Sequence, residues 1–209
     1  MKNILKFIFL SLLFVVSGFS QGFNVGKSGA QTFWFVAKSN QATFLSSTPL
    51  EDVTGVSNDI KGSVTFDVNN IKTLKGSVSI STGSLRTGID LRDEHLKSSN
   101  WLDAESYPEI IFTIKRVSDV QMLSDNSLKA MVAGDFSLHG VTKEVTADVT
   151  INYVVESEQT RERGPGDFLG VQAKFDIVLS DYKVSNKILG EKVSDKIAIT
   201  ANIVGSNAK

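Results

Sequence analysis

The strongest constraint on the fold is an alternation of apolar and polar residues, with a period of two, that recurs along most of the chain after residue 21. Successive side chains of a β-strand point to opposite faces, so this pattern predicts strands with one buried face and one wet face. One-sided alternation of this kind is typical of antiparallel sheets rather than of parallel α/β sheets. We expect strands over residues 32–37, 41–45, 64–68, 75–80, 110–114, 128–138, 144–155, 171–179 and 197–203.

The length of two of these segments, 128–138 and 144–155, indicates how the sheet is arranged. Twelve residues at about 3.3 Å each reach roughly 40 Å, which is more than a compact sandwich usually uses. Long strands in this number favour a closed barrel, because closure removes exposed sheet edges. The sequence therefore predicts an all-β chain with a single antiparallel barrel of about eight strands.

One stretch lacks the alternation and predicts a short helical insert near residues 90–104. Asp90 is a suitable N-cap for a helix over residues 91–98, and Pro108 ends any helix before the strand at residue 110. The polar segment 156–167 contains Gly164, Pro165 and Gly166 and is expected to be a hairpin loop within the same domain.

Residues 1–20 have the three parts of a secretory signal peptide. Lys2 and Lys6 form the positive region, residues 7–16 form the apolar run, and Gly18 and Ser20 precede a predicted cleavage before Gln21. The alternative is an uncleaved anchor, but the run is shorter than the ~20 apolar residues that span a bilayer. We expect a periplasmic or secreted protein in which residues 21–209 form one domain, with no stable membrane insertion after cleavage.

Composition excludes several classes of function. The chain has 22 basic and 23 acidic residues, a net charge of −1, which argues against a nucleic-acid partner. It has no cysteine, which excludes disulfides, thiol nucleophiles and cysteine-based metal sites. No glycine-rich phosphate loop follows a predicted strand into a helix, so no cofactor is expected.

The residues that suggest catalysis or metal binding are His95, His139 and Ser137. Metal sites usually need three or four ligands at recognisable spacing, and the two histidines belong to different predicted elements. Structural roles in a turn or a helix cap are therefore favoured over a metal site or an acid/base pair. Ser137 fits no nucleophile-elbow spacing and alternates outward on its strand, so we expect no catalytic residue.

Two segments carry a resemblance to a known family. Residues 85–112 (LRTGIDLRDEHLKSSNWLDAESYPEIIF) contain Thr87-Gly88, Arg92-Asp93, His95-Leu96, Trp101, Tyr107-Pro108 and Phe112, and residues 134–145 read GDFSLHGVTKEV. In this order the two segments resemble the signature of the YceI-like family of exported, lipocalin-like, polyisoprenoid-binding proteins. The chain departs from the family at Val25-Gly26-Lys27-Ser28, where many members carry a histidine.

The resemblance implies a lipocalin-like barrel whose interior binds a long apolar ligand: a polyisoprenoid, a fatty acid or a fatty amide. Inward-facing alanines among larger apolar residues are compatible with a cavity, although the same pattern also fits a dry core. For Arg92 we favour a structural pair with Asp93, and contact with a ligand headgroup is the alternative. The predicted ligand-binding residues are Phe66, Val68, Arg92, Trp101, Tyr107, Phe112, Ile114, Val132, Phe136, Val149, Phe175 and Ile199.

The function expected from these observations is an exported carrier that sequesters one long-chain lipid or isoprenoid ligand. Two alternatives stay open: a cell-envelope hydrolase that uses outward carboxylates, and a solid-barrel adaptor that docks a membrane partner. A homodimer also stays open.

Overall fold

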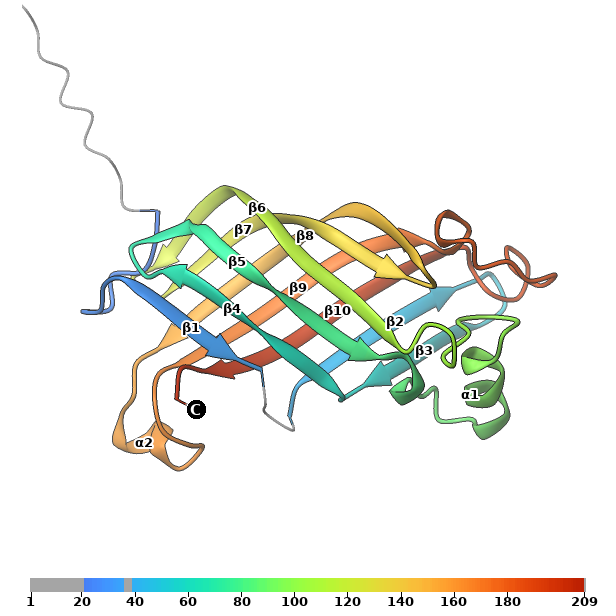
Figure 1. Ribbon diagram of the computed structural model, residues 1–209, viewed down its shortest axis with the longest axis horizontal. Helices are drawn as coiled ribbons and strands as arrows, with labels where there is room; N and C mark the ends of the chain where they lie inside the picture. Colours follow the sequence, from blue (N-terminus) through green and yellow to red (C-terminus); the bar gives the residue numbers. More distant parts are fainter. Residues whose placement is uncertain (1–20, 36–38, 209) are drawn as a thin grey trace, which may run out of the picture.

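The computed structural model describes residues 21–35 and 39–208, which form one antiparallel sheet of ten strands (Figure 1). The predicted signal peptide lies outside the described residues. The strands are β1 (Ala30–Trp34), β2 (Gln41–Ser47), β3 (Asp52–Ser57), β4 (Ile60–Asp67), β5 (Asn70–Ser81), β6 (Glu109–Ser124), β7 (Ser127–Leu138), β8 (Val141–Val154), β9 (Phe168–Val178) and β10 (Lys196–Ser206).

The sheet closes into a barrel through its first strand. β1 pairs with β4 over its whole length and reaches β10 on its other side at Trp34 and Ser206. The ring therefore runs β1-β4-β5-β6-β7-β8-β9-β10 and back to β1, which confirms the predicted barrel of eight strands. The hairpin of β2 and β3 continues the sheet from β10 at the other end of the barrel.

The structure differs from the predicted strands mainly at β3, which the alternation did not indicate. The more buried face of this strand includes Gly55 and Ser57, so it carries no row of large apolar residues. The strand predicted over 32–37 is observed as β1, and residues 36 and 37 lie outside the described residues.

The predicted helical insert is present between β5 and β6 and covers one end of the barrel (Figure 1). It contains a 3-10 turn, η1 (Thr82–Ser84), and the helix α1 (Asp90–Lys97). The prediction that Asp90 caps this helix is wrong, because the cap position is Ile89 and no side chain caps it. A second short helix, α2 (Glu158–Arg161), lies in the β8–β9 loop, and η2 (Leu179–Tyr182) follows β9.

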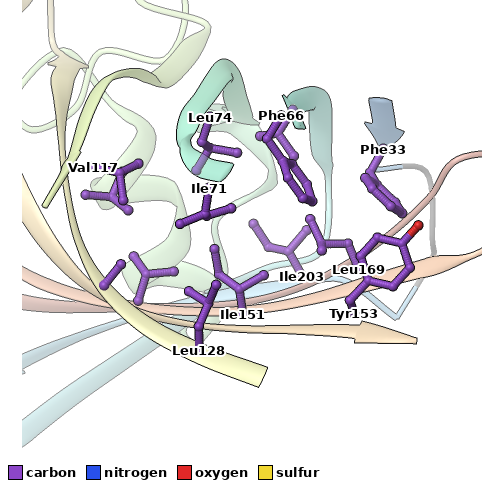
Figure 2. Close-up of a cluster of buried hydrophobic side chains, with 14 of the residues drawn as sticks. Phe33, Phe66, Ile71, Leu74, Val117, Leu128, Ile151, Tyr153, Leu169 and Ile203 are labelled. Atoms are coloured by element: carbon purple, nitrogen blue, oxygen red, sulfur yellow. The ribbon is translucent and has the colours of Figure 1, made fainter. Parts of the chain in front are cut away.

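The end of the barrel opposite the insert is filled by aromatic rings. Phe23, Phe33, Phe66 and Tyr153, which we call the aromatic plug, have side chains at most 1% exposed. Their ring centroids are 5.5–5.9 Å apart in four contacts, with Phe33 and Phe66 stacked and Phe33 and Tyr153 edge-on. Figure 2 shows Phe33, Phe66 and Tyr153 beside Leu169, with Ile151 and Leu128 from the neighbouring strands nearby.

The segment before β1 closes this end over the plug. The backbone N–H of Phe23 donates to the carbonyl of Val68 at 2.7 Å, and the backbone N–H of Asn24 donates to the carbonyl of Asp125 at 2.8 Å. Both acceptors lie in or next to strand turns at this end, so these bonds hold the Phe23 ring inside the barrel.

A buried carboxylate fastens the plug to the loop that follows it. The Tyr153 hydroxyl donates to Asp167 at 2.6 Å, and the backbone N–H of Glu156 donates to the other oxygen of the same carboxylate at 2.8 Å. Asp167 is only 4% exposed. Burial, together with this bond to a carboxylate, raises the pKa of the Tyr153 hydroxyl, which therefore stays protonated and donating at neutral pH.

Replacing Tyr153 by Phe should lower the free energy of unfolding by about 1–3 kcal/mol, because one oxygen of a buried carboxylate loses its hydrogen bond and keeps only the ammonium group of Lys27, 3.8 Å away. Urea denaturation at neutral pH measures this change. Tyr182→Phe is the matched control, since Tyr182 is equally buried but no hydrogen bond of its hydroxyl is seen within the described residues. Equal losses in the two variants would contradict the role given to the Tyr153–Asp167 bond.

Candidate ligand-binding cavity

The barrel is hollow between the insert and the aromatic plug. The cavity has a volume of about 380 Å³, and apolar side chains make up almost all of its wall. This volume lies within the ~300–1,000 Å³ typical of small-molecule sites. Leu74, Ile151, Leu169 and Ile203 line its inner end and also belong to the core cluster around the plug. The solid-barrel alternative therefore does not fit the interior.

Small side chains on neighbouring strands account for the space. Ala42 on β2, Ala201 on β10, Ala173 on β9 and Val149 on β8 are direct partners across the sheet and all line the cavity. Cross-strand partners point to the same face, so these four side chains form a continuous band of small residues on the inner wall. Larger residues at these positions would fill the space.

Aromatic rings line the wall between this band and the insert. Phe175 lies 5.3 Å from Phe136 and 6.0 Å from Phe112, measured between ring centroids. Phe112 lies over Gly134. A Cβ atom at position 134 would be 2.5 Å from the carbonyl oxygen of Thr113 and 2.7 Å from the Phe112 ring, so a side chain there would displace both. The glycine of the segment GDFSLHG therefore has a packing role on the cavity wall.

Most of the predicted ligand-binding residues line this cavity, although their contact with a ligand stays a prediction. Phe66 and Val68 do not line it, because they lie deeper, in the core around the aromatic plug. Alternation predicts which face of a strand points inward but not the depth of a residue along the barrel axis, so it cannot separate these two residues from those on the cavity wall. The predicted residues on the wall are Arg92, Trp101, Phe112, Ile114, Val132, Phe136, Val149, Phe175 and Ile199.

Tyr107 also lies away from the cavity. Its ring packs edge-on against His139 with centroids 4.7 Å apart, and its carbonyl accepts the hydroxyl of Thr82 at 2.7 Å. His139 has a φ of 49° in the β7–β8 turn, and its Nδ1 is 3.1 Å from the carbonyl of Tyr182. Tyr107 therefore fastens the insert to that turn rather than lining the entrance.

The insert also places charged groups at the cavity. Asp93 is 7% exposed and accepts both the backbone N–H and the hydroxyl of Thr87, each at 2.6 Å. These hydrogen bonds, the hydroxyl first, hold the pKa of Asp93 below its usual range. The favoured structural pair of Arg92 with Asp93 is not observed. Arg92 lines the cavity instead, with a nitrogen 4.0 Å from a carboxylate oxygen of Glu51.

The residues that suggested catalysis are not brought together. His95 lines the cavity, whereas His139 lies in the β7–β8 turn. The hydroxyl of Ser137 is hydrogen-bonded to the hydroxyl of Thr142 at 2.7 Å. Within residues 21–35 and 39–208, no group of three or more metal-ligating side chains is arranged to hold an ion. None of the helices in these ranges is long and apolar enough to cross a membrane.

Sequence reasoning missed two parts of the wall, the β2–β3 hairpin and the loop before β10. The hairpin contributes Phe44, whose ring lies over Gly55 on the paired strand, and the loop contributes Ile188 and Val193. The signal for the hairpin was the turn Thr48-Pro49-Leu50-Glu51 between two short strands. The loop has no periodicity that could have indicated it.

The aromatic plug is packed, whereas the cavity wall borders empty space. Shortening a Phe side chain to Ala should therefore cost more stability in the plug than on the wall. Phe66→Ala should lower the free energy of unfolding by about 3–5 kcal/mol, because it opens a void in a packed region. Phe112→Ala should cost no more than about 2 kcal/mol, because its ring already borders a cavity. Chemical denaturation of both variants tests this, and equal costs would mean that the wall is packed as tightly as the plug.

Asp93→Asn should destabilise the protein by about 1–3 kcal/mol at pH 7, because two hydrogen bonds to a carboxylate are weakened. Since the pKa of Asp93 is lowered on folding, its contribution is present above the unfolded pKa of about 4 and is lost as the pH falls through the folded value. Denaturation curves at pH 7 and pH 3 should show the difference from the unaltered protein shrinking at the lower pH.

The control for this experiment is Asp90→Asn, which removes the same charge from the same helix. Asp90 is exposed in the first turn and makes no cap hydrogen bond, so its replacement should cost less than about 1 kcal/mol. A loss at Asp93 that is no larger than at Asp90, or that is the same at both pH values, would contradict the role of the Thr87 bonds.

Known proteins resemble this chain in both sequence and fold. A UPF0312 protein of Pseudomonas fluorescens is 36% identical over 98 residues, which cover 47% of this chain and half (50%) of that protein. Protein YceI of Salmonella agona is 27% identical over 213 residues, covering 100% of this chain and 99% of that protein. The solved polyisoprenoid binding domain from Saccharophagus degradans has the same fold, with a TM-score of 0.63 and 15% identity over 84% of this chain and 98% of that domain. The YceI-like domain model matches residues 32–205, and the chain therefore belongs to the YceI-like family.

Proposed function

We propose that this protein binds one long-chain apolar molecule inside its barrel and carries or sequesters it. The observation that carries this proposal is the apolar cavity, which extends from the insert to the aromatic plug. A polyisoprenoid, a fatty acid or a fatty amide has the elongated apolar shape that such a cavity accepts. The description of the Saccharophagus degradans domain as polyisoprenoid-binding supports the same class of ligand.

Burial of the chain supplies the free energy for binding without any catalytic chemistry. About ten buried methylene groups contribute on the order of 8 kcal/mol in total, at ~0.8 kcal/mol each. Ordering of a flexible chain and loss of its free motion reduce this value. The alternative of a hydrolase that uses outward carboxylates has less support, because Asp135, Glu144 and Asp176 on the outer face are engaged in ion pairs with Lys115, Arg116 and Lys196.

Export of the protein is part of the proposal. Its support is the signal-peptide pattern of residues 1–20, which predicts a periplasmic or secreted location. A carrier in such a compartment would keep an insoluble chain molecule out of water while it moves through the envelope. The proposal needs only one copy of the chain, because one barrel forms the whole cavity wall.

Ala173→Phe should lower the affinity for long-chain ligands at least tenfold, because the new ring fills the space left by the band of small residues. The measurements are native mass spectrometry of freshly purified protein, organic extraction of bound lipid, and titration with the neutral fluorophore 1-N-phenylnaphthylamine. Overpacking should cost about 1–3 kcal/mol of stability at most, which denaturation can verify.

Lys174→Ala is the control, since Lys174 is the adjacent exposed residue on the outer face of β9. It should leave lipid content and probe affinity unchanged. The proposal fails if the unaltered protein yields no lipid and binds no probe, or if Ala173→Phe binds as tightly as the unaltered protein does.

A further inference from the structure

All the ionisable side chains that line the cavity, within the described part of the chain, lie at its insert end. They are Glu51 on the β2–β3 turn, Arg92 and His95 on α1, and Lys192 on the loop before β10. Arg92 and Lys192 are cationic, and Glu51 is the one acidic residue among the four. We call these four residues the rim. The rim thus offers more positive than negative charge to a molecule that enters.

The orientation of α1 produces this imbalance, although the helix itself carries several acids. Arg92, His95 and Leu96 follow the i, i+3, i+4 spacing of one helix face, and all three line the cavity. Asp90 and Glu94 are exposed and are not part of the wall. The helix therefore brings Arg92 and His95 to the cavity, whereas Asp90, Glu94 and Lys97 are not part of the wall.

Asp93, the third acidic residue of α1, is already hydrogen-bonded to Thr87. Both hydrogen bonds of Thr87 go to the buried carboxylate of Asp93, next to Arg92 in the sequence. This contact anchors the helix. Within the described residues Asp93 forms no ion pair with Arg92, and the cations whose charge acts on its carboxylate are Lys97 and Arg86.

The contact between Arg92 and Glu51 is weak. The two charged groups are 4.0 Å apart, and their side chains are 34% and 55% exposed. An exposed pair at this distance contributes little to stability, and the guanidinium keeps donors for another acceptor. A carboxylate or phosphate could therefore replace Glu51 in a two-pronged contact with Arg92.

The polar side chains that line the cavity beyond the rim are already hydrogen-bonded to other groups of the protein. Ser46 accepts the backbone N–H of Ser194 at 2.9 Å, and the hydroxyl of Thr43 donates to the carbonyl of Thr200 at 3.4 Å. Beyond them the wall is apolar as far as the plug. A polar head that moved past the rim would lose its water without gaining partners, so it must stay at the rim.

We propose that the rim selects a single-chain amphiphile with an anionic head, held by Arg92 with His95 and Lys192 beside it, while Glu51 competes for the same guanidinium. This inference rests on the proposed binding of a chain in the barrel. It adds the chemical class of the head, which the apolar wall cannot discriminate because burial of a chain depends on its area and not on its charge.

The experiment measures how well ligands of one chain length displace 1-N-phenylnaphthylamine from the protein. Hexadecanoate and hexadecyl phosphate carry anionic heads, and hexadecanamide is the neutral counterpart. In the unaltered protein both anions should bind about tenfold more tightly than the amide, as a partly exposed charge-assisted contact allows. Arg92→Gln should remove this preference by lowering the affinity for both anions to that for the amide, and Glu51→Gln should increase the preference.

Arg92→Lys should retain part of the preference, because the positive charge remains while the two-pronged geometry of the guanidinium is lost. This variant separates loss of charge from loss of local structure. Lys115→Gln is the control, because it removes one positive charge from a residue that pairs with Asp135 and Glu144 and is not part of the cavity wall. It should change no affinity.

The outcomes separate the two proposals. Equal binding of anions and amide by the unaltered protein, or a preference that survives Arg92→Gln, overturns the anionic-head inference and leaves chain binding intact. Failure of the neutral fluorophore and of all three ligands to bind overturns the proposed function and the inference with it.

Discussion

The interior of this protein depends on the fixed width of a ring of eight strands. At each position along the barrel axis, the size of the inward side chains decides whether the interior is filled or hollow. At one end the rings of Phe23, Phe33, Phe66 and Tyr153 meet across the barrel and exclude other molecules. Farther along, alanines on neighbouring strands are too small to meet, and a cavity results. One backbone architecture therefore yields a packed end and a hollow end.

The sequence could predict the barrel and its inward faces, because alternation with a period of two records which side of a strand is buried. Phe112, Phe136 and Phe175 were assigned to the wall on that basis, and they line it. Alternation could not separate these residues from Phe66, which points inward at a different depth. Depth depends on strand tilt and on contacts between distant strands, and neither leaves a local pattern in the chain.

Strand β3, the start of helix α1 and the wall residues before β10 could not be predicted from the sequence, because contacts with other segments replace the usual local signals there. The inward positions of β3 include Gly55, whose missing side chain is covered by the ring of Phe44 from the paired strand. Helix α1 has no side-chain cap, and its orientation depends instead on the bonds between Thr87 and Asp93. The wall residues before β10 lie in a loop without periodicity. In each case the partner is outside the segment that a local pattern covers.

The division between the two ends also separates stability from binding. A hollow barrel loses packing contacts along its wall, and this cost must be offset elsewhere in the fold. The aromatic plug, the segment over it and the buried Tyr153–Asp167 hydrogen bond provide compensating contacts at the end of the barrel opposite the insert. The insert end is held by separate hydrogen bonds, such as those of Asp93 and of Thr82 with the Tyr107 carbonyl, rather than by a continuous packed core. Residues at the rim can therefore differ in charge and size without opening the plug. Under the proposed function, the kind of head that is accepted can then change while the barrel that buries the chain stays the same.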